Sequence, residues 1–376
     1  MRILHILEAT AGGTRRHVLD LLPALARRGL DCTLIYSPLR YPPFERDAAL
    51  LREQNITTIP VPMTRSWDAA VDLPAIQTIR SVIAKSTFDI IHAHSSKAGF
   101  VGRLAAGIRH RSTVIYTPHC IAPHAALPLR QRRLARLAET LLAPLTARYI
   151  AVSMPEKRFL QHSGIARRRP VHLIYNGIDA NGAAEPMPHS PVFHLGCIGR
   201  LSQQKNQEFT LYLLRELLRA SSHPPQLHLV GDGENRTALQ QLARRWGVHD
   251  SVVWHGDVAD PTSLYAQCDV MLQPSRWEGC PYSVLEAMAA ARPVLASSAG
   301  AMPELLHGCG ETFKLHHPHH WLHTLKNWQE NHSEREALGK RARERVQRYF
   351  CLDAMVEKTL RVYQENGMPR NQRFVP

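Results

Sequence analysis

Short runs of hydrophobic residues alternate with amphipathic stretches along most of the chain. In the first half these runs predict strands at residues 3–7, 32–36, 58–61, 89–92, 114–116, 149–152 and 172–175. A second series follows residue 191 and predicts strands at residues 193–198, 226–230, 252–255, 270–273 and 293–296. Strands that alternate with helical stretches are typical of doubly wound parallel sheets. The pattern therefore predicts an α/β protein with two Rossmann-like domains.

The length of the chain and one polar stretch define the expected domains. The 376 residues exceed the size at which a single hydrophobic core is usual. Asn176-Gly177-Ile178, followed by a proline-rich stretch up to Pro191, is typical of an interdomain connection. We expect a first domain over residues 1–180, a second over 181–352, and a C-terminal helix and tail over 353–376. The pattern leaves open whether this helix packs back on the first domain.

The composition is that of an ordinary globular protein. No segment reaches the roughly 18 consecutive apolar residues that a membrane span needs. The first predicted strand carries His5 and Glu8, so it does not resemble a signal peptide, and we expect a cytoplasmic location. A histidine run at His316, His317, His319 and His320 has no cysteine or carboxylate at ligand spacing, which favours a solvated loop over a metal site.

Positive charge is concentrated in the first half of the chain. Residues 1–180 hold 25 of the 46 Lys and Arg residues but 12 of the 32 Asp and Glu residues. Such an excess can attract nucleic acid, anionic lipid or a phosphorylated substrate. We expect no nucleic-acid partner, because the sequence lacks an aromatic-interleaved basic stripe and a helix-turn-helix pattern.

Two glycine-containing turns follow predicted strands and suit the binding of phosphate groups. Gly12 and Gly13 precede a predicted helix, whose N-terminus can face an anion, although the full Gly-x-Gly-x-x-Gly fingerprint of dinucleotide binding is missing. In the second half, Gly199 ends a strand and is followed by Arg200 and then Lys205. These two cations are expected at the carboxyl edge of a parallel sheet, where such folds bind ligands, and they suit a diphosphate.

A pair of carboxylates follows a later strand. Glu278 and Glu286 are separated by seven residues, and Pro281 between them suits the first helical position. Glu286 is then expected one turn inside a helix and Glu278 in the loop before it. N–H groups near Tyr282 and Ser283 would form a second phosphate cradle. The carboxylates suit sugar hydroxyls, since they would repel phosphate; the alternative is a pair of surface charges at a helix start.

The combination of these segments resembles the retaining family-four glycosyltransferases. The similarity extends over nearly the whole chain, and the segments fall in family order: Gly12-Gly13, residues 89–95, 117–119, 176–179 and 199–205, Gly231-Asp232-Gly233 and residues 278–286. The resemblance implies the GT-B fold, in which two Rossmann-like domains face each other. It also implies that the donor binds mainly to the second domain and the acceptor to the first.

The resemblance also implies roles for individual residues. Glu286 would bind the donor ribose, Glu278 the sugar hydroxyls, and His119 would point at the sugar, although Cys120 replaces the glycine usual after this histidine. His92 and His94 either line the cleft or are buried core residues. The predicted catalytic residues are His119, Glu278, Arg200 and Lys205. The predicted donor-binding residues are Gly12, Gly13, Arg200, Lys205, Gly279, Cys280, Tyr282, Ser283 and Glu286.

No metal ion or cofactor is expected, and the nucleotide-diphosphate sugar is a co-substrate. No Asp-x-Asp motif occurs, and Arg200, Lys205 and helix N-termini can stabilise a departing diphosphate without a metal. Retention by attack on the same face of the sugar is what the resemblance implies. The alternatives are a nucleotide-sugar epimerase of the same fold and a basic nucleic-acid-binding protein.

A basic amphipathic stretch bears on the acceptor. Residues 129–145 carry four arginines, Arg130, Arg132, Arg133 and Arg136, beside Leu134, Leu137, Leu141 and Leu145. This pattern suits a helix on an anionic membrane surface, and it also suits an ordinary surface helix. The segment 92–104 resembles enzymes of capsule, exopolysaccharide and lipopolysaccharide assembly, whose acceptors are lipid-linked. We therefore expect a lipid-linked glycan acceptor and a peripheral position at the inner face of the plasma membrane.

Overall fold

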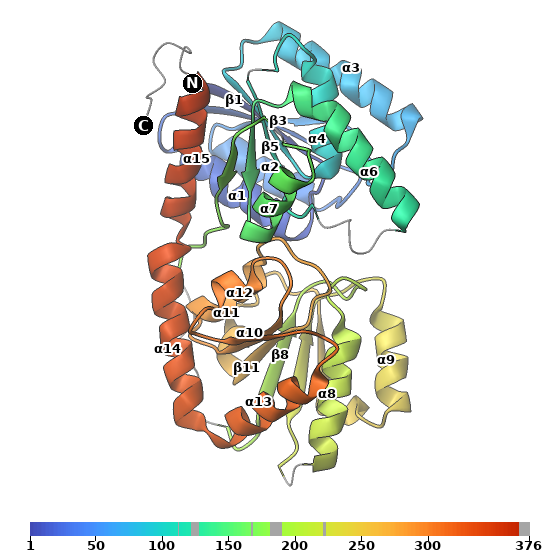
Figure 1. The fold of residues 1–376 in the computed structure, drawn as a ribbon, viewed down its shortest axis with the longest axis vertical. Coiled ribbons are helices and arrows are strands. Elements are labelled where there is room, and N and C mark those ends of the chain that lie inside the picture. Colours follow the sequence, from blue (N-terminus) through green and yellow to red (C-terminus); the bar gives the residue numbers. More distant parts are fainter. Residues whose placement is uncertain (112, 122–127, 167, 181–189, 221–222, 368–376) are drawn as a thin grey trace. The chain divides into compact units, whose positions relative to one another are not determined.

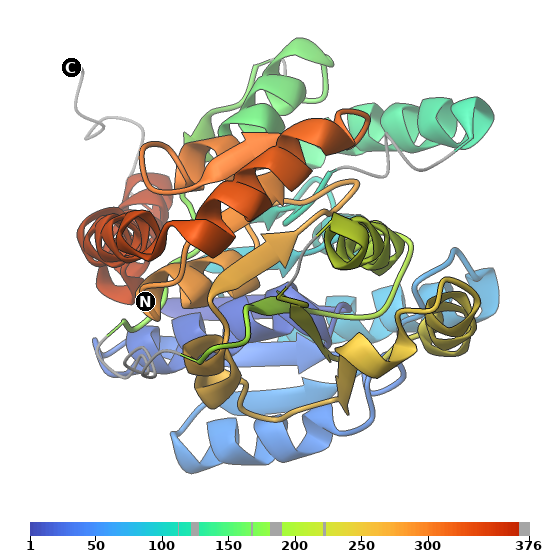
Figure 2. The same ribbon diagram turned by 90° about the horizontal axis from the view of Figure 1, so that it is seen from below.

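The computed structural model describes residues 1–111, 113–121, 128–166, 168–180, 190–220 and 223–367. The chain divides into two units (Figure 1), one of Met1–Asn176 with Leu352–Pro376 and one of Gly177–Cys351. Each unit contains one parallel sheet with helices on both faces (Figures 1 and 2). The α/β class expected from the strand pattern is confirmed.

The first sheet has seven parallel strands in the order β3-β2-β1-β4-β5-β6-β7. Its strands are β1 (Arg2–Leu7), β2 (Asp31–Tyr36), β3 (Thr57–Pro60), β4 (Ile90–His94), β5 (Val114–Thr117), β6 (Arg148–Ala151) and β7 (Val171–Leu173). Its helices are α1 (Gly12–Ala26), α2 (Phe44–Glu53), α3 (Ala69–Lys85), α4 (Ser96–Ala106), α6 (Leu129–Leu142), the 3₁₀ turn η1 (Ala143–Leu145), α7 (Met154–His162) and α15 (Leu352–Gly367).

Strands β1 and β4 form the middle of the first sheet, with Ile3 opposite Ile90. The hydrophobic side chains of both strands are buried, because α1, α2 and α15 pack on one face and α3 and α4 on the other. Strands buried on both faces carry continuous hydrophobic runs. That is the physical reason why the sequence pattern located them.

The last helix, α15, packs in the first unit, which answers the question that the sequence left open. The Tyr363 hydroxyl lies 2.6 Å from Nδ1 of His92 on β4. Arg148 on β6 donates from Nε to Oδ1 of Asn366 at 3.3 Å and pairs with Glu365. The helix therefore closes the hydrophobic core of the unit in which the chain begins.

The second sheet has six parallel strands in the order β10-β9-β8-β11-β12-β13. Its strands are β8 (His194–Ile198), β9 (Gln226–Val230), β10 (Val252–Gly256), β11 (Val270–Gln273), β12 (Val294–Ser297) and β13 (Glu311–Phe313). Helices α8 (Gln207–Ala220), α9 (Arg236–Arg245) and α13 (Pro318–Glu330) pack on one face. The remaining elements are α10 (Thr262–Gln267), α11 (Tyr282–Ala289), α12 (Met302–Leu305), α14 (His332–Tyr349) and the 3₁₀ turn η2 (His249–Ser251).

The structure corrects three local expectations. Pro281 is the N-cap of α11, so the helix begins one residue later than predicted. His319 and His320 lie in the first turn of α13, where a loop was expected. Helix α6 ends at Leu142, so Leu145 lies outside it in η1. Among the described residues, none of the helices is long and apolar enough to cross a bilayer.

Candidate active site

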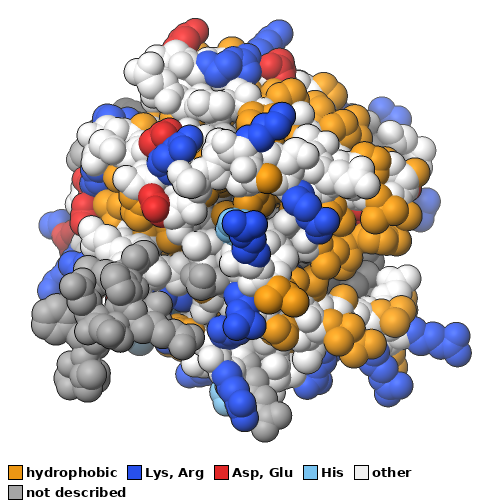
Figure 3. Space-filling model, turned by 90° about the horizontal axis from the view of Figure 1, so that it is seen from above, with side chains coloured by type: hydrophobic (Ala, Val, Ile, Leu, Met, Phe, Trp, Pro, Cys, Tyr) orange, Lys and Arg blue, Asp and Glu red, His pale blue; other side chains and the backbone are white. Residues whose placement is uncertain are grey.

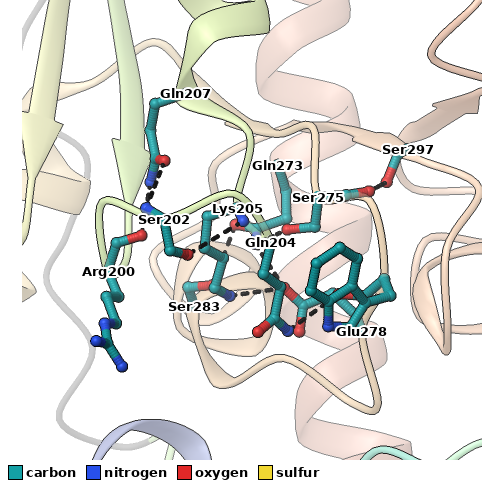
Figure 4. Close-up of polar contacts among 11 residues, drawn as sticks. Arg200, Ser202, Gln204, Lys205, Gln207, Gln273, Ser275, Glu278, Ser283 and Ser297 are labelled. Atoms are coloured by element: carbon teal, nitrogen blue, oxygen red, sulfur yellow. Dashed lines mark hydrogen bonds and ion pairs between the residues drawn. The ribbon is translucent and has the colours of Figure 1, made fainter. Parts of the chain in front are cut away.

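A cluster of polar side chains joined by hydrogen bonds and an ion pair lies at the carboxyl edge of the sheet in the second unit (Figure 4). Lys205, in the loop after β8, places its Nζ 2.7 Å from Oε1 of Glu278, in the loop after β11. The Glu278 side chain is 7% exposed and that of Lys205 is 18% exposed. Water screens this ion pair less than a surface pair, so the charges act strongly on any group that enters between them.

A glutamine at the end of β11 holds the Glu278 carboxylate in place. Gln273 donates from Nε2 to Oγ of Ser275 at 2.9 Å and to Oε1 of Glu278 at 3.4 Å. Its Oε1 accepts a hydrogen bond from Oγ of Ser283 at 3.2 Å. One amide therefore links the strand end, the Glu278 loop and the first turn of α11. Sequence reasoning missed Gln273, although a polar residue at the carboxyl end of a buried strand could have signalled it.

Hydrogen bonds to backbone carbonyls join the two loops that carry Lys205 and Glu278. Gln204 donates from Nε2 to the carbonyl of Trp277 at 3.0 Å, and the Arg276 N–H donates to the carbonyl of Gln204 at 2.8 Å. Asn206 donates from Nδ2 to the carbonyl of Pro274 at 3.1 Å. These bonds fix the separation of the two loops, so the approach of Lys205 to Glu278 does not depend on the ion pair alone.

A glycine allows the Glu278 loop to pack closely on its neighbour. Gly300 has a φ of 57°, and a Cβ there would lie 2.2 Å from the carbonyl oxygen of Glu278. The Ala301 N–H donates to the carbonyl of Gly279 at 2.8 Å. Any larger residue at position 300 would push the loop away from its place. The sequence did not single out this glycine, because only the tertiary contact reveals it.

Helix α11 presents its N-terminus beside the Lys205–Glu278 pair. Its first turn holds no acidic residue, and Gly279, Cys280 and Tyr282 around its start are buried. A helix N-terminus carries partial positive charge and suits an anion. The N–H groups near Tyr282 and Ser283 therefore lie close to the loop in which Glu278 pairs with Lys205. That they form a phosphate cradle stays a prediction.

Glu286 lies on the next turn of α11 and is partly buried. Its Oε2 accepts a hydrogen bond from the hydroxyl of Tyr265 at 2.7 Å. Burial, and then the neighbouring carboxylate, raise the pKa of Tyr265 well above its usual value, so the phenol stays protonated and continues to donate. The carboxylate can accept further hydrogen bonds, which suits a pair of vicinal hydroxyls.

Arg200 is not part of this cluster in the structure. Its side chain is 54% exposed and pairs with Glu234, with Nε 3.0 Å from Oε2. In Figure 4 its guanidinium points away from Glu278. An exposed ion pair of this kind contributes about 0–1 kcal/mol, so Arg200 can exchange partners at little cost. The sequence placed the two cations together, and the structure brings only Lys205 to the carboxylate.

The predicted glycine turn lies in the first unit. Gly12 begins α1 with a φ of 67°, and the first turn of that helix holds no acidic residue. A Cβ at Gly12 would meet nothing within 4 Å, so the backbone conformation, and not space, requires glycine there. Gly12 and Gly13 belong to the first unit, and the other predicted donor residues belong to the second.

His119 follows β5 and joins a cluster of buried histidines. His119 itself has a φ of 63°, which is in the left-handed region. Cys120 is not among the described residues with a positive φ, so the backbone does not require glycine at position 120. Nε2 of His119 lies 3.1 Å from Nδ1 of His94. Burial lowers the pKa values of His94 and His119 well below the usual value, so both rings are neutral at pH 7. His92 and His94 are buried core residues, which was the plainer of the two expectations.

A buried carboxylate that the sequence analysis missed fixes the loop after His119. Glu156, in the first turn of α7, accepts hydrogen bonds from the N–H of Ile121 at 3.0 Å and of Val152 at 2.8 Å. Burial raises its pKa to about 7 despite these two bonds. The role of Glu156 is therefore to position the segment that follows β5.

Helix α6 carries the predicted basic stretch on the surface of the first unit. Leu134, Leu137 and Leu141 are 65%, 55% and 69% exposed. Arg130 and Arg133 stand one turn before Leu134 and Leu137, so they flank this exposed stripe. Figure 3 shows a face of the molecule on which basic side chains lie among hydrophobic ones.

The other arginines of α6 differ in their surroundings. Arg136 donates from Nε and Nη2 to the carbonyl of Ser163, at 3.0 and 2.6 Å, so its head group is held by the protein. Arg132 is exposed. Of the four arginines that the sequence grouped together, Arg130 and Arg133 are therefore the pair aligned with the leucines.

Two sequence models of known protein families match the two halves of the chain. Residues 11–181 match the sequence model described as Glycosyltransferase Family 4, and residues 192–327 match that described as Glycosyl transferases group 1. The UDP-Gal:alpha-D-GlcNAc-diphosphoundecaprenol alpha-1,3-galactosyltransferase of Escherichia coli is 26% identical over 255 residues, which cover 63% of this chain and 64% of that protein. The chain thus spans less than two thirds of the length of that relative.

A second relative and one solved structure extend the comparison. The putative glycosyltransferase EpsD of Bacillus subtilis is 27% identical over 265 residues, which cover 65% of this chain and 68% of that protein. The crystal structure of Anabaena Alr3699/HepE in complex with UDP superimposes with a TM-score of 0.78 and 21% identity, over 97% of this chain and all of that one. This likeness confirms the predicted fold. Together with the two matched sequence models, it shows that the chain is a glycosyltransferase of the family-four type with the GT-B fold.

Proposed function

We propose that the protein is a retaining, metal-independent glycosyltransferase that uses a nucleotide-diphosphate sugar to extend a lipid-linked bacterial surface glycan. The observation that carries this proposal is the Lys205–Glu278 pair beside the N-terminus of α11. A cation, a helix N-terminus and a shielded carboxylate in one place can hold a diphosphate and the sugar attached to it. Glu286, further along α11, then suits the ribose of the nucleotide.

The chemistry follows from the charges that develop during transfer. The bond between the anomeric carbon and the diphosphate breaks, so negative charge grows on the leaving group while positive charge grows on the sugar. Lys205 and the start of α11 stabilise the former, and Arg200 exchanges Glu234 for the diphosphate. The acceptor hydroxyl then attacks the face that the diphosphate leaves and passes its proton to an oxygen of the departing diphosphate, which retains the configuration. The metal-free character rests on these cations, which supply the charge that a metal ion would otherwise provide.

The ion pair also explains how Glu278 becomes available. A diphosphate that binds Lys205 competes with Glu278 for the ammonium group, and the carboxylate then accepts hydrogen bonds from sugar hydroxyls. Gln273 continues to donate to Glu278 and keeps it in place during this exchange. The salt bridge therefore holds both groups in the place where this exchange would occur.

The acceptor side of the proposal rests on the first unit. The galactosyltransferase relative is named for a diphosphoundecaprenol acceptor, and the first half of this chain carries most of the net positive charge. Helix α6 adds an exposed leucine stripe flanked by Arg130 and Arg133. An amphipathic basic helix binds anionic membranes, where such acceptors reside. We accordingly place the enzyme at the cytoplasmic face of the plasma membrane.

Liposome flotation tests this membrane contact. Wild-type protein should float with phosphatidylglycerol vesicles at low salt, and a variant with Arg130→Gln and Arg133→Gln should bind about 30-fold more weakly, because each cation contributes about 1 kcal/mol near such a surface. Raising the salt to 1 M should reduce wild-type binding, since the Debye length falls to about 3 Å. The charge-matched control changes the exposed Arg27 and Arg46 to glutamine. Equal flotation of the two variants would remove α6 from the proposal.

The activity itself is tested with a panel of nucleotide sugars. We expect the purified protein to release a nucleoside diphosphate slowly from one of them without an acceptor, and much faster with a lipid-linked glycan. UDP-sugars come first in the panel, because the similar Anabaena structure contains UDP. Conversion of the donor into its epimer with no release of diphosphate would contradict transfer and select the epimerase alternative.

A further inference from the structure

Five imidazole rings gather inside the first unit. His5 on β1 is the register partner of His92 on β4, and His94 lies two residues further along the same strand. His17 reaches the cluster from α1, and His119 reaches it from the end of β5. All five are at most 9% exposed. Burying so many polar rings is costly for a core that hydrophobic residues could fill, which calls for a reason beyond packing.

Hydrogen bonds determine which nitrogens can act as ligands. Nδ1 of His17 lies 3.0 Å from Oδ1 of Asn176, an acceptor, so Nδ1 carries the proton and Nε2 presents its lone pair. His92 has both nitrogens bonded to hydroxyl groups, of Tyr363 at 2.6 Å and of Thr117 at 2.7 Å. Nε2 of His5 has no partner among the described residues. The cluster is thus not a fully satisfied polar network, because one nitrogen of His5 lacks a partner. His17, with its proton on Nδ1, can use Nε2 as a metal ligand.

The geometry points to a site for a divalent transition-metal ion, with Zn²⁺ as its probe, formed by His17, His94 and His119. Ligand atoms of these three residues lie within 4.8 Å of one another. Nδ1 of His94 and Nε2 of His119 are 3.1 Å apart. A tetrahedral zinc ion with Zn–N bonds of about 2.0–2.1 Å needs nitrogens about 3.3–3.4 Å apart, so small ring movements suffice.

Zinc binding at this site releases no proton, because the neutral imidazoles only exchange the ring nitrogens that carry their protons. Binding needs lone pairs on Nδ1 of His94 and Nε2 of His119, so the proton shared between them moves within the string of imidazoles. His94 then carries its proton on Nε2, which lies 3.1 Å from Nδ1 of His5, and His5 carries its proton on Nε2. His119 carries its proton on Nδ1. Burial lowers the pKa of all three ligands, to about 4 for His17, so each enters in the neutral form that metals bind.

Outer hydrogen bonds favour this set over the other candidate. His5, His92 and His94 also bring ligand atoms within 4.8 Å of one another. Using His92 would break a bond to Tyr363 or Thr117. In the proposed set, the second nitrogen of His17 donates to the amide oxygen of Asn176 and that of His94 donates to Nδ1 of His5, so these bonds orient both rings for binding. Three imidazoles suit zinc and leave one position open.

The expected effect of a bound ion on activity rests on the proposed function, whereas the site itself does not. His119 is the residue expected to point at the donor sugar, and zinc would occupy one of its nitrogens. Zn²⁺ should therefore inhibit transfer, whereas a chelator should leave activity unchanged or raise it. The ion is thus an inhibitor and takes no part in the reaction.

Zinc titration of the full chain tests the site without any measurement of activity. The background protein carries His316→Gln, His317→Gln, His319→Gln and His320→Gln, which removes the exposed run on α13 and before it. Calorimetry, with competition against a chromogenic chelator, should give one Zn²⁺ per chain. His17→Gln and His94→Gln should each weaken binding more than the roughly 10–100-fold typical of losing an outer partner. Circular dichroism and thermal unfolding establish that each variant is folded.

Two controls separate this site from its neighbours. His228→Gln alters another buried histidine, bonded to His194 and His255 in the second unit, and should leave zinc affinity unchanged. His92→Gln should change it by less than tenfold. The proposal is overturned if the folded background protein binds no zinc, if His17→Gln binds as well as the background, or if His92→Gln abolishes binding while His17→Gln does not. Donor hydrolysis without zinc tests the proposed function separately.

Discussion

Replacing Lys205 with alanine should lower turnover about 10²-fold or more. The ammonium group faces the carboxylate of Glu278 at 2.7 Å and is the cation placed to meet the departing diphosphate. Removing one preorganised stabiliser of a developing anion costs on the order of 10²–10³ in rate. Donor affinity must be measured with turnover, because a cation that holds the ground state equally well changes binding more than rate.

Arg200→Ala should have an effect of the same order, although Arg200 rests against Glu234 in the structure. Arg236→Ala is the matched control, since Arg236 is a partly exposed arginine of the same unit, paired with Asp232. It should leave turnover within about twofold. A chelator should leave the wild type active. Complete loss of activity in EDTA, restored by Mg²⁺ or Mn²⁺, would show that the metal-free mechanism is wrong.

Because Lys205→Ala leaves a shielded carboxylate without its cation, stability is measured as well. Glu278 is 7% exposed, and an unpaired charge in such a place destabilises a fold. Adding Glu278→Gln to Lys205→Ala should recover thermal stability but not turnover. Recovery of turnover in the double variant would mean that Lys205 acts only through the fold.

Glu286→Gln should raise the dissociation constant of the donor tenfold or more while thermal stability holds. The carboxylate is expected to accept charge-assisted hydrogen bonds from the ribose, and such bonds contribute about 1.5–3 kcal/mol. Tyr265→Phe is the control, because it removes the hydrogen bond to Oε2 and keeps the charge. Its effect on donor affinity should be smaller. Unchanged affinity in Glu286→Gln, measured by titration, would contradict the ribose assignment.

Periodicity sufficed for most of the fold because the central strands are buried on both faces. The sequence missed β13, a three-residue edge strand that begins with the exposed Glu311. It also could not place α15, because the hydrophobic face of a helix does not identify the surface against which the helix packs. The hydrogen bond between His92 and Tyr363 depends on two segments that are far apart in the chain.

Some features of the candidate site could likewise be predicted from the sequence, and others depend on tertiary contacts. The donor-binding roles of Glu278, Glu286 and Lys205 stay predictions. Spacing along the chain was enough to place Lys205 and Glu278 at one edge of a sheet, because their loops follow predicted strands. It could not find Gln273 or Tyr265, whose roles arise from a side chain that reaches a neighbouring loop or helix. Nor could it foresee that Arg200 rests against Glu234, or that the carbonyl of Ser163 holds Arg136.

One measurement tests the central claim most directly. The purified protein is incubated with its nucleotide sugar and a polyprenyl-diphosphate oligosaccharide, and NMR identifies the product and the configuration of its new linkage. The account predicts that the sugar appears on the acceptor with the anomeric configuration it had in the donor, and that Lys205→Ala slows this transfer about 10²-fold or more. A product of inverted configuration, or no transfer from any nucleotide sugar by folded protein, would contradict it.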